Sequence, residues 1–207
     1  GEGASSRNGG IASGNLRMTF GTMIKTYGVE RAKAIYGEGF RAREDLKRFV
    51  EQENIDCDYQ EVGRWTGANR LKHYDSQARE ADFLNEHFDT GAYMVQQADQ
   101  HSEIGSDLYY GGQIRPDIHG VHPGKLHHGI LARAMEAGVD VQNRTEVTGI
   151  RQDGDRFEVQ TSRGTIKARN VIVATNGYTG KATPWLQRRV IPIPSHIIAT
   201  ETLPQDV

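Results

Sequence analysis

The sequence predicts an α/β fold, and three observations about its apolar residues support this. Apolar residues recur at three- and four-residue steps across residues 29–54, which is the spacing of an amphipathic helix. Residues 123–138 (PGKLHHGILARAMEAG) predict another helix, with proline at its start and glycine at its end. Residues 171–174 (VIVA) are an unbroken apolar run, typical of a strand buried on both faces of a parallel sheet.

The remaining elements follow in chain order. Residues 1–14 are rich in glycine and serine and predict a loop. We expect a strand over residues 58–68 and a helix over residues 75–88, whereas residues 89–121 show little periodicity. After the helix that starts at Pro123, alternating patterns and turn residues predict strands at 139–142, 145–150, 156–161, 165–168 and 188–203.

Composition excludes several classes of protein. The 207 residues include 25 basic and 27 acidic side chains, so no excess of positive charge attracts nucleic acid. Cys57 is the single cysteine, which excludes an internal disulfide and a cysteine-based zinc cluster. No apolar run approaches the roughly 18 residues of a membrane span, and no secretory signal pattern is visible. We therefore expect a cytoplasmic protein without a transmembrane segment.

The first loop nearly matches a dinucleotide-binding fingerprint through Gly1, Gly3 and Ser6. That fingerprint requires a strand before the glycines and a helix after them, and neither is predicted here. Small residues and the donors of Ser5 and Arg7 fit another kind of loop, one that contacts a phosphate or a ribose. A plain solvated loop is the alternative.

A second glycine-containing segment, Thr175-Asn176-Gly177, directly follows the apolar run 171–174. Ligands of open α/β sheets bind beyond the carboxyl ends of the strands, where glycine allows a cofactor to approach the backbone. This position favours a cofactor contact, although an ordinary turn would look the same.

Four histidines and one aromatic loop are further candidate sites. The histidines lie within ten residues, but two successive ones on a helix point about 100° apart, so we expect no metal site. These residues are His119, His122, His127 and His128. Tyr110 and Arg115 are candidates for the substrate side of a pocket, and surface positions in a turn are the alternative.

Taken together, these segments resemble the FAD-dependent oxidoreductases of the D-amino-acid oxidase type, which include glycine oxidase, sarcosine oxidase and γ-glutamylputrescine oxidase. Residues 3–10 (GASSRNGG) are similar to the family's GASGRNGG loop, which lies along the cofactor. Residues 122–126 resemble the start of the helix that re-enters the FAD domain, and residues 145–150 resemble a strand that contacts the adenine. Residues 174–178 (ATNGY) resemble a segment near the pyrophosphate. The resemblance is strongest to the γ-glutamylputrescine oxidase-like branch.

The resemblance implies a partial FAD-binding, Rossmann-like domain interleaved with part of an α+β substrate domain. Residues 1–55 and 119–182 would belong to the FAD domain, and residues 56–118 and 183–207 to the substrate domain. The implied cofactor is FAD, and the residues implied to bind it are Gly3, Ala4, Ser5, Ser6, Arg7, Asn8, Gly9, Gly10, Val147, Thr175 and Gly177.

The chain also departs from the family pattern. A first strand with a true GxGxxG, an acidic ribose-binding residue and the family's C-terminal half are not visible in the sequence. Ser6 stands where the family usually has glycine. We therefore expect an internal piece of a longer protein whose remainder completes the fold.

The implied reaction oxidises the C–N bond of a small amine or amino acid. A hydride passes from the carbon that bears the amine to the flavin, and the imine is then hydrolysed. Because the flavin supplies this chemistry, no acid/base pair is required, and no catalytic residue is assigned. Two alternatives stay open: a flavin dehydrogenase of a hydroxy substrate such as glycerol phosphate, or a non-catalytic piece that does not bind the cofactor alone. We expect the isolated chain to be inactive.

Overall fold

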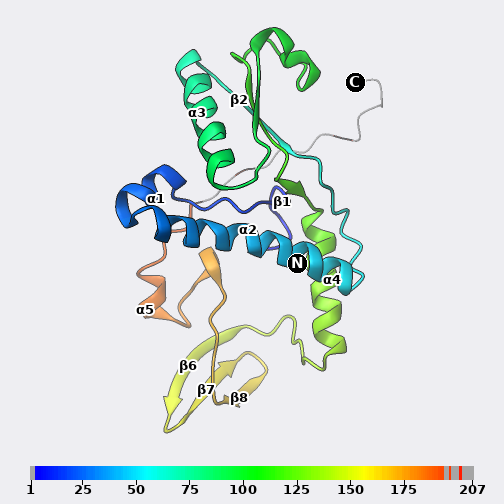
Figure 1. Cartoon of the computed structure of the whole chain (residues 1–207). Coiled ribbons are helices and arrows are strands. Elements are labelled where there is room, and N and C mark those ends of the chain that lie inside the picture. Colours follow the sequence, from blue (N-terminus) through cyan, green and yellow to red (C-terminus); the bar gives the residue numbers. More distant parts are fainter. Residues whose placement is uncertain (1–2, 194–195, 197–200, 202–207) are drawn as a thin grey trace. The chain divides into compact units, whose positions relative to one another are not determined.

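The computed structural model describes residues 3–193, 196 and 201, and the chain divides into two compact units, residues 1–137 and 138–207. Both units contain helices and strands, so the α/β class is confirmed (Figure 1). The first unit contains β1 (Ile11–Ala12), α1 (Phe20–Tyr27), α2 (Val29–Gln52), β2 (Arg64–Gly67), α3 (Leu71–His87), β3 (Tyr93–Val95), the 3₁₀ helix η1 (Gln97–Ser102), β4 (Gly112–Arg115), β5 (His119–Gly120) and α4 (Pro123–Glu136). The second contains β6 (Val147–Asp153), β7 (Arg156–Thr161), β8 (Gly164–Ala168), the 3₁₀ helix η2 (Asn176–Tyr178) and α5 (Pro184–Gln187).

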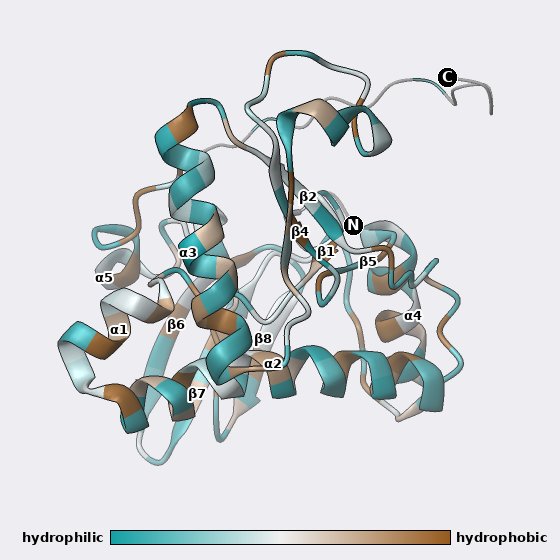
Figure 2. Cartoon of the chain, turned by 45° about the horizontal axis from the view of Figure 1, so that its top comes forward, coloured by the Kyte–Doolittle hydropathy of each residue, from teal (hydrophilic) through white to brown (hydrophobic). Residues whose placement is uncertain are grey.

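Helices α1 and α2 supply four of the five buried residues of one hydrophobic core in the first unit. The side-chain oxygen of Thr19 accepts the backbone N–H of Thr22 at 3.4 Å and caps α1. Gly28, at φ +80°, ends α1, and α2 then covers nearly all of the predicted helix 29–54. Hydrophilic and hydrophobic residues alternate along α2 (Figure 2), which leaves one face for the core. The buried residues of this core are Phe20, Met23, Ala32, Tyr36 and Leu84.

Glycine is required where the segment before α1 crosses α2. A side-chain carbon at Gly39 would overlap the backbone oxygen of Gly14. A side-chain carbon at Gly14 would in turn crowd the backbone of Gly39 and Phe40. The two glycines therefore let the loop touch the helix backbone, and α2 continues through both Gly37 and Gly39 without a break.

Three antiparallel strands form a sheet in the order β2-β4-β3, and α3 lies against β3 and β4. Arg64 pairs with Arg115, and Thr66 pairs with Gln113. Because side chains alternate between the faces of a strand, these four residues share one face of the sheet.

The structure shortens one predicted strand and lengthens one predicted helix. Of the predicted strand 58–68, only Arg64–Gly67 pairs with β4. Gln60 instead forms an isolated antiparallel bridge with Gly120. Helix α3 begins one turn before the predicted helix 75–88.

The short strands β1 and β5 connect the N-terminal loop to α4. Ile11 pairs with Gly120 in an antiparallel arrangement, so the loop that ends at β1 lies beside the start of α4. The His122 side chain accepts the backbone N–H of Lys125 at 3.2 Å and caps this helix. Proline follows the cap at the first helical position, and Gly138, at φ +86°, lies just beyond the helix end, as predicted.

The second unit is organised by the antiparallel meander β6-β7-β8. The predicted strand 156–161 is confirmed as β7, and the predicted strands 145–150 and 165–168 correspond to β6 and β8. Arg151 lies opposite Glu158 in the register and forms an ion pair with it. This cross-strand pair supports the register of an exposed sheet.

Two predicted strands are wrong. Residues 139–142 and 171–174 form no strand, and Ile172 is 90% exposed rather than buried. A buried parallel strand needs hydrogen-bonding neighbours on both sides, and every strand pair among the described residues is antiparallel and excludes these segments. A short run of apolar residues therefore does not by itself predict a strand in these two segments.

The predicted strand 188–203 falls partly outside the described residues. Residues 190–193 are not in a strand. Most of the other residues of this segment are not among the described residues, so the prediction is not tested there. Across the helices that the structure describes, none combines the length and apolarity that a membrane span requires.

Candidate functional site

Short-range hydrogen bonds fold the loop 3–10 against itself. The Asn8 side-chain amide donates to the carbonyl oxygens of Ala4 and Ser5 at 3.0 and 3.3 Å. Its Oδ1 accepts the backbone N–H of Gly10 at 2.9 Å. One asparagine thus fixes the shape of a loop whose composition alone would allow many conformations.

Gly10 anchors this loop to the segment before α4. It is buried at φ +64°, and its carbonyl oxygen accepts the backbone N–H of Val121 at 2.8 Å. A side-chain carbon at Gly10 would overlap the Val121 carbonyl oxygen, so glycine is required by both conformation and space.

The opposite side of the loop faces solvent. Gly3 and Ser6 are half-buried, and the exposed members are Ala4, Ser5, Arg7, Asn8 and Gly9. Small residues and exposed hydroxyl and guanidinium donors can approach a phosphate or a sugar closely. The loop is therefore anchored at one end and accessible along its length.

In the second unit, Val147 and Thr175 line one cavity of about 710 Å³. Its walls come from residues 145–150, Val159 and residues 171–183, and most of the lining is apolar. Threonine hydroxyls and the Lys181 ammonium group add a few polar groups. An apolar space of this size with few polar groups is typical of a small-molecule site.

The turn after this cavity takes its unusual backbone conformation at asparagine, not at glycine. Asn176 adopts φ +48°, and its carbonyl oxygen accepts the Thr179 hydroxyl at 2.6 Å. That hydroxyl also lies 2.8 Å from the hydroxyl of Thr175. A side-chain carbon at Gly177 would only reach ordinary contact with Pro192, at 3.6 Å. Asparagine tolerates the left-handed conformation because its short side chain can bond locally.

The structure thus places the predicted cofactor residues in two groups. Gly3 to Gly10 form one loop of the first unit. Val147 and Thr175 share the cavity of the second unit, and Gly177 lies between two residues that line it, Thr175 and Tyr178.

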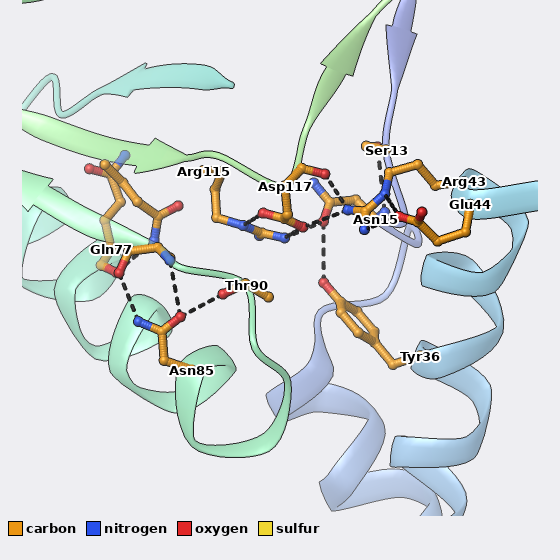
Figure 3. Close-up of polar contacts among 12 residues, drawn as sticks. Ser13, Asn15, Tyr36, Arg43, Glu44, Gln77, Asn85, Thr90, Arg115 and Asp117 are labelled. Carbon is orange, nitrogen blue, oxygen red and sulfur yellow. Dashed lines mark hydrogen bonds and ion pairs between the residues drawn. The ribbon is translucent and has the colours of Figure 1, made fainter. Parts of the chain in front are cut away.

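The two substrate-side candidates differ in their surroundings. Tyr110 is 45% exposed, and its backbone N–H donates to the carbonyl oxygen of Ala68 at 2.8 Å. Arg115 is buried, and its Nε and Nη2 donate to the carboxylate oxygens of Asp117 at 2.6 and 2.7 Å (Figure 3). Burial is the largest single influence and opposes its charge, but the hydrogen bonds to Asp117 and the attraction of nearby negative charges, that of Asp117 first, together raise the pKa of Arg115.

A polar network around Arg115 was not anticipated from the sequence. Arg43, on α2, donates to both the backbone carbonyl and the carboxylate of Asp117. The Tyr36 hydroxyl donates to Oδ1 of Asn15 at 3.4 Å, and the same oxygen accepts Nη2 of Arg115 at 3.4 Å (Figure 3). Burial also raises the pKa of Tyr36. The short Arg-Pro-Asp spacing in the sequence could indicate the ion pair of Arg115 with Asp117. The hydrogen bond between Arg115 and Asn15 could not be inferred, because the two residues are 100 positions apart in the sequence.

The histidine cluster is largely explained by structural contacts. Nδ1 of His119 hydrogen-bonds with the Tyr59 hydroxyl at 2.7 Å, and His122 caps α4. The rings of His127 and His128 contact each other with centroids 5.9 Å apart. Within the part of the chain that the structure describes, no three metal-ligating side chains converge on one point.

Comparison with known proteins decides the family. Residues 1–207 match the family described as FAD dependent oxidoreductase, abbreviated DAO. The chain belongs to this family.

Curated relatives support the assignment. The chain is 29% identical over 212 residues to gamma-glutamylputrescine oxidoreductase of Escherichia coli (strain K12), covering 100% of this chain and 48% of the relative. It is also 29% identical over 211 residues to the probable oxidoreductase OrdL of Rhizobium meliloti (strain 1021), covering 98% and 47%. This member of the DAO family therefore spans about half the length of the curated relatives it matches.

Solved structures agree on the fold. Glycine oxidase from Geobacillus kaustophilus superposes with a TM-score of 0.70 at 20% identity, covering 89% of this chain and 48% of that one. Glycine oxidase from Bacillus cereus ATCC 14579 gives a TM-score of 0.64 at 17% identity, covering 90% and 50%. The two units of this DAO-family chain thus adopt part of the fold of those enzymes.

Proposed function

We propose that this chain supplies part of the FAD-binding site of an enzyme that oxidises the C–N bond of an amino acid or amine. The observation that carries the proposal is the match of residues 1–207 to the DAO family. The predicted cofactor residues Val147 and Thr175 share one cavity, and the loop 3–10 offers exposed donors, which supports it further.

The residues present fit FAD. The cavity beside Val147 is large enough for a nucleoside, and its apolar walls suit a flat purine ring while the threonine hydroxyls suit a ribose. In the first unit, Ser5 and Arg7 would supply donors to phosphate or ribose oxygens, with Gly10 holding the loop in place. When bound, FAD supplies the hydride-accepting chemistry, and the imine product is then hydrolysed.

The substrate class comes from the relatives. Gamma-glutamylputrescine oxidoreductase and glycine oxidase are named for amine and amino-acid substrates, so we propose a small molecule of this class.

The division into FAD-domain segments 1–55 and 119–182 and substrate-domain segments 56–118 and 183–207 stays a prediction. The cytoplasmic location stays a prediction as well.

The whole reaction belongs, in this proposal, to a longer protein. The chain covers 48% of the E. coli relative, and the remaining half would complete the substrate site and the FAD site. We therefore expect the 207-residue chain alone to show no amine oxidation. Catalytic residues are not assigned within it.

The first experiment is the visible absorption spectrum of the purified chain after incubation with FAD and gel filtration. We expect a flavin band to stay with the protein.

The Gly177→Val variant should retain less flavin because a branched side chain narrows the approach to the turn beside the cavity. Gly105→Val is the matched control, since Gly105 has open space around it and lies far along the chain from the predicted FAD residues. A colourless wild-type protein would contradict FAD binding by this chain.

Substrate class is tested on the longer protein. Amines and amino acids should bleach the bound flavin under anaerobic conditions, and hydroxy compounds such as glycerol phosphate should not. Bleaching by the hydroxy compound alone would replace the amine proposal with the dehydrogenase alternative.

A further inference from the structure

Asparagine is followed directly by glycine at two places in the sequence, Asn8-Gly9 and Asn176-Gly177. This pair of residues is prone to spontaneous deamidation, because glycine leaves its backbone nitrogen free to approach the side-chain carbonyl carbon of the asparagine before it. Neither glycine is crowded, since an added side-chain carbon would lie 3.9 Å from its nearest contact at Gly9 and 3.6 Å at Gly177. A difference in reactivity must therefore come from what holds each asparagine.

Hydrogen bonds hold the Asn8 side chain at both ends of its amide. Nδ2 donates to the carbonyl oxygens of Ala4 and Ser5, and Oδ1 accepts the backbone N–H of Gly10. Rotation of this amide, or the departure of Nδ2 as ammonia, therefore breaks hydrogen bonds that the folded loop provides. The fold protects Asn8.

The Asn176 side chain has no such restraint. It is exposed, and within the described part of the chain its amide forms no hydrogen bond. The turn uses the backbone carbonyl of Asn176 instead, which accepts both the hydroxyl and the backbone N–H of Thr179. The attacking group is free as well, since the Gly177 N–H has no acceptor among the described residues.

We propose that Asn176 is the preferred deamidation site of the folded chain. The Gly177 nitrogen forms a bond to Cγ of Asn176, and the bond from Cγ to Nδ2 breaks, so that ammonia leaves with the proton of the attacking nitrogen. Water then opens the resulting cyclic imide at either carbonyl and gives aspartate or isoaspartate. Solvent water is the co-reactant, so neither an enzyme nor a cofactor is required.

Deamidation would change the turn beside the cavity that Thr175 and Tyr178 line. Either product adds one negative charge, and isoaspartate also lengthens the backbone where Asn176 has φ +48°. The added carboxylate disfavours an anionic ligand at the same place. A chain that ages in solution should therefore lose affinity for FAD. This consequence rests on the proposed function, whereas the deamidation itself does not.

The first test compares the two asparagines in one sample. The folded 207-residue chain is incubated at mildly alkaline pH, which favours loss of the proton from the attacking nitrogen, and is then digested with trypsin. Mass spectrometry follows the conversion of amide to acid in peptides 8–17 and 170–181, and fragment spectra assign the residue. We expect Asn176 to react about tenfold faster than Asn8, because at least one hydrogen bond must break at Asn8. Equal rates, or a faster reaction at Asn8, would overturn the proposal.

Unfolding separates the effect of structure from that of local sequence. In concentrated guanidinium chloride the hydrogen bonds of Asn8 are lost, so the two asparagines should react at similar rates. An unchanged ratio of rates in the unfolded chain would refute the structural explanation, because the ratio would then come from the neighbouring residues alone.

The Gly177→Ala variant tests the attacking nitrogen. Alanine is accommodated there, since Gly177 has no positive φ and the added carbon reaches only ordinary contact with Pro192. Deamidation at Asn176 should slow several-fold, because the new side chain hinders the approach of the nitrogen. Gly105→Ala, which places a methyl group in open space, is the matched control and should react like the wild type. A wild-type rate in Gly177→Ala would contradict attack by this nitrogen.

The consequence for flavin is tested with Asn176→Asp, which imitates one product. It should retain several-fold less flavin after gel filtration than Asn176→Gly, which permits the same turn conformation without adding charge. Equal retention by the two variants would rule out the effect of the charge. A colourless wild-type chain that still deamidates rapidly at Asn176 would contradict the proposed function and support the deamidation site.

Discussion

Gly10 and its neighbour Gly9 show how differently two adjacent glycines can be constrained. Gly10 is buried at φ +64° against the Val121 carbonyl, whereas the nearest atoms to a side-chain carbon at Gly9 are those of Ile11, at 3.9 Å. The same residue type is therefore structurally required at one position and replaceable at the next.

Gly10→Ala should lower the free energy of unfolding by about 1–3 kcal/mol, because the left-handed backbone is strained for alanine and the added carbon overlaps Val121. Urea unfolding followed by circular dichroism measures the change. Gly9→Ala is the control and should stay within about 0.5 kcal/mol of the wild type. Equal effects of the two substitutions would contradict the anchoring role of Gly10.

His119 couples the stability of the first unit to pH. Burial lowers its pKa, with a further contribution from the positive charge of Arg43, while Glu44 and Glu61 act in the opposite direction. The unfolded state, with a histidine pKa of about 6.5, therefore takes up a proton before the folded state does. The stability due to neutral His119 is present above that pH and is lost as the pH falls toward the lower folded pKa.

We therefore expect the urea midpoint to decrease below about pH 6.5. His119→Gln should weaken this pH dependence, because the glutamine side chain cannot titrate. His73→Gln, an exposed position on α3, is the control and should keep the wild-type slope. Identical slopes in His119→Gln and the wild type would contradict the assignment to His119.

At the scale of elements, Asp117 joins α2 to the sheet. It lies between β4 and β5, accepts hydrogen bonds from Arg115 on β4 and Arg43 on α2, and is 8% exposed in its side chain. If this carboxylate is neutralised, buried Arg115 loses the carboxylate that compensates its charge, whereas Arg43 keeps its ion pair with Glu44.

Asp117→Asn should therefore lower the free energy of unfolding by about 3–5 kcal/mol, the usual effect of removing one partner of a buried ion pair. Chemical denaturation measures it. The exposed pair of Glu38 and Arg41 on α2 is the control, and Glu38→Gln should produce no measurable change. A loss in Asp117→Asn no larger than in this control would show that the network does not join the elements.

At the scale of the whole molecule, local patterns predicted the helices α2, α3 and α4 and the three strands of the second unit, and missed the contacts between elements. Helix 29–54 and strand 156–161 were predictable because each satisfies its own periodicity. Residues 171–174 were not, because a strand exists only with neighbours that local sequence does not specify. The site shows the same limit, since the cofactor segments could be named but the contact of Asn15 with Arg115 could not.

The misassigned segment 171–174 also determines the surface of the second unit. Val171 and Val173 line two neighbouring cavities with apolar walls, and Ile172 is 90% exposed. Contiguous exposed apolar surface binds hydrophobic molecules, whereas single exposed apolar residues do not.

The chain should therefore bind a fluorescent hydrophobic dye in its folded state, and Ile172→Asn should reduce the fluorescence. Leu108→Asn is the matched control, because Leu108 is 81% exposed but lines none of the cavities described above. Added FAD should also compete with the dye if the cavity beside Val147 holds the nucleoside. Equal dye binding by Ile172→Asn and Leu108→Asn would show that segment 171–173 forms no continuous apolar surface, whatever the outcome of the competition.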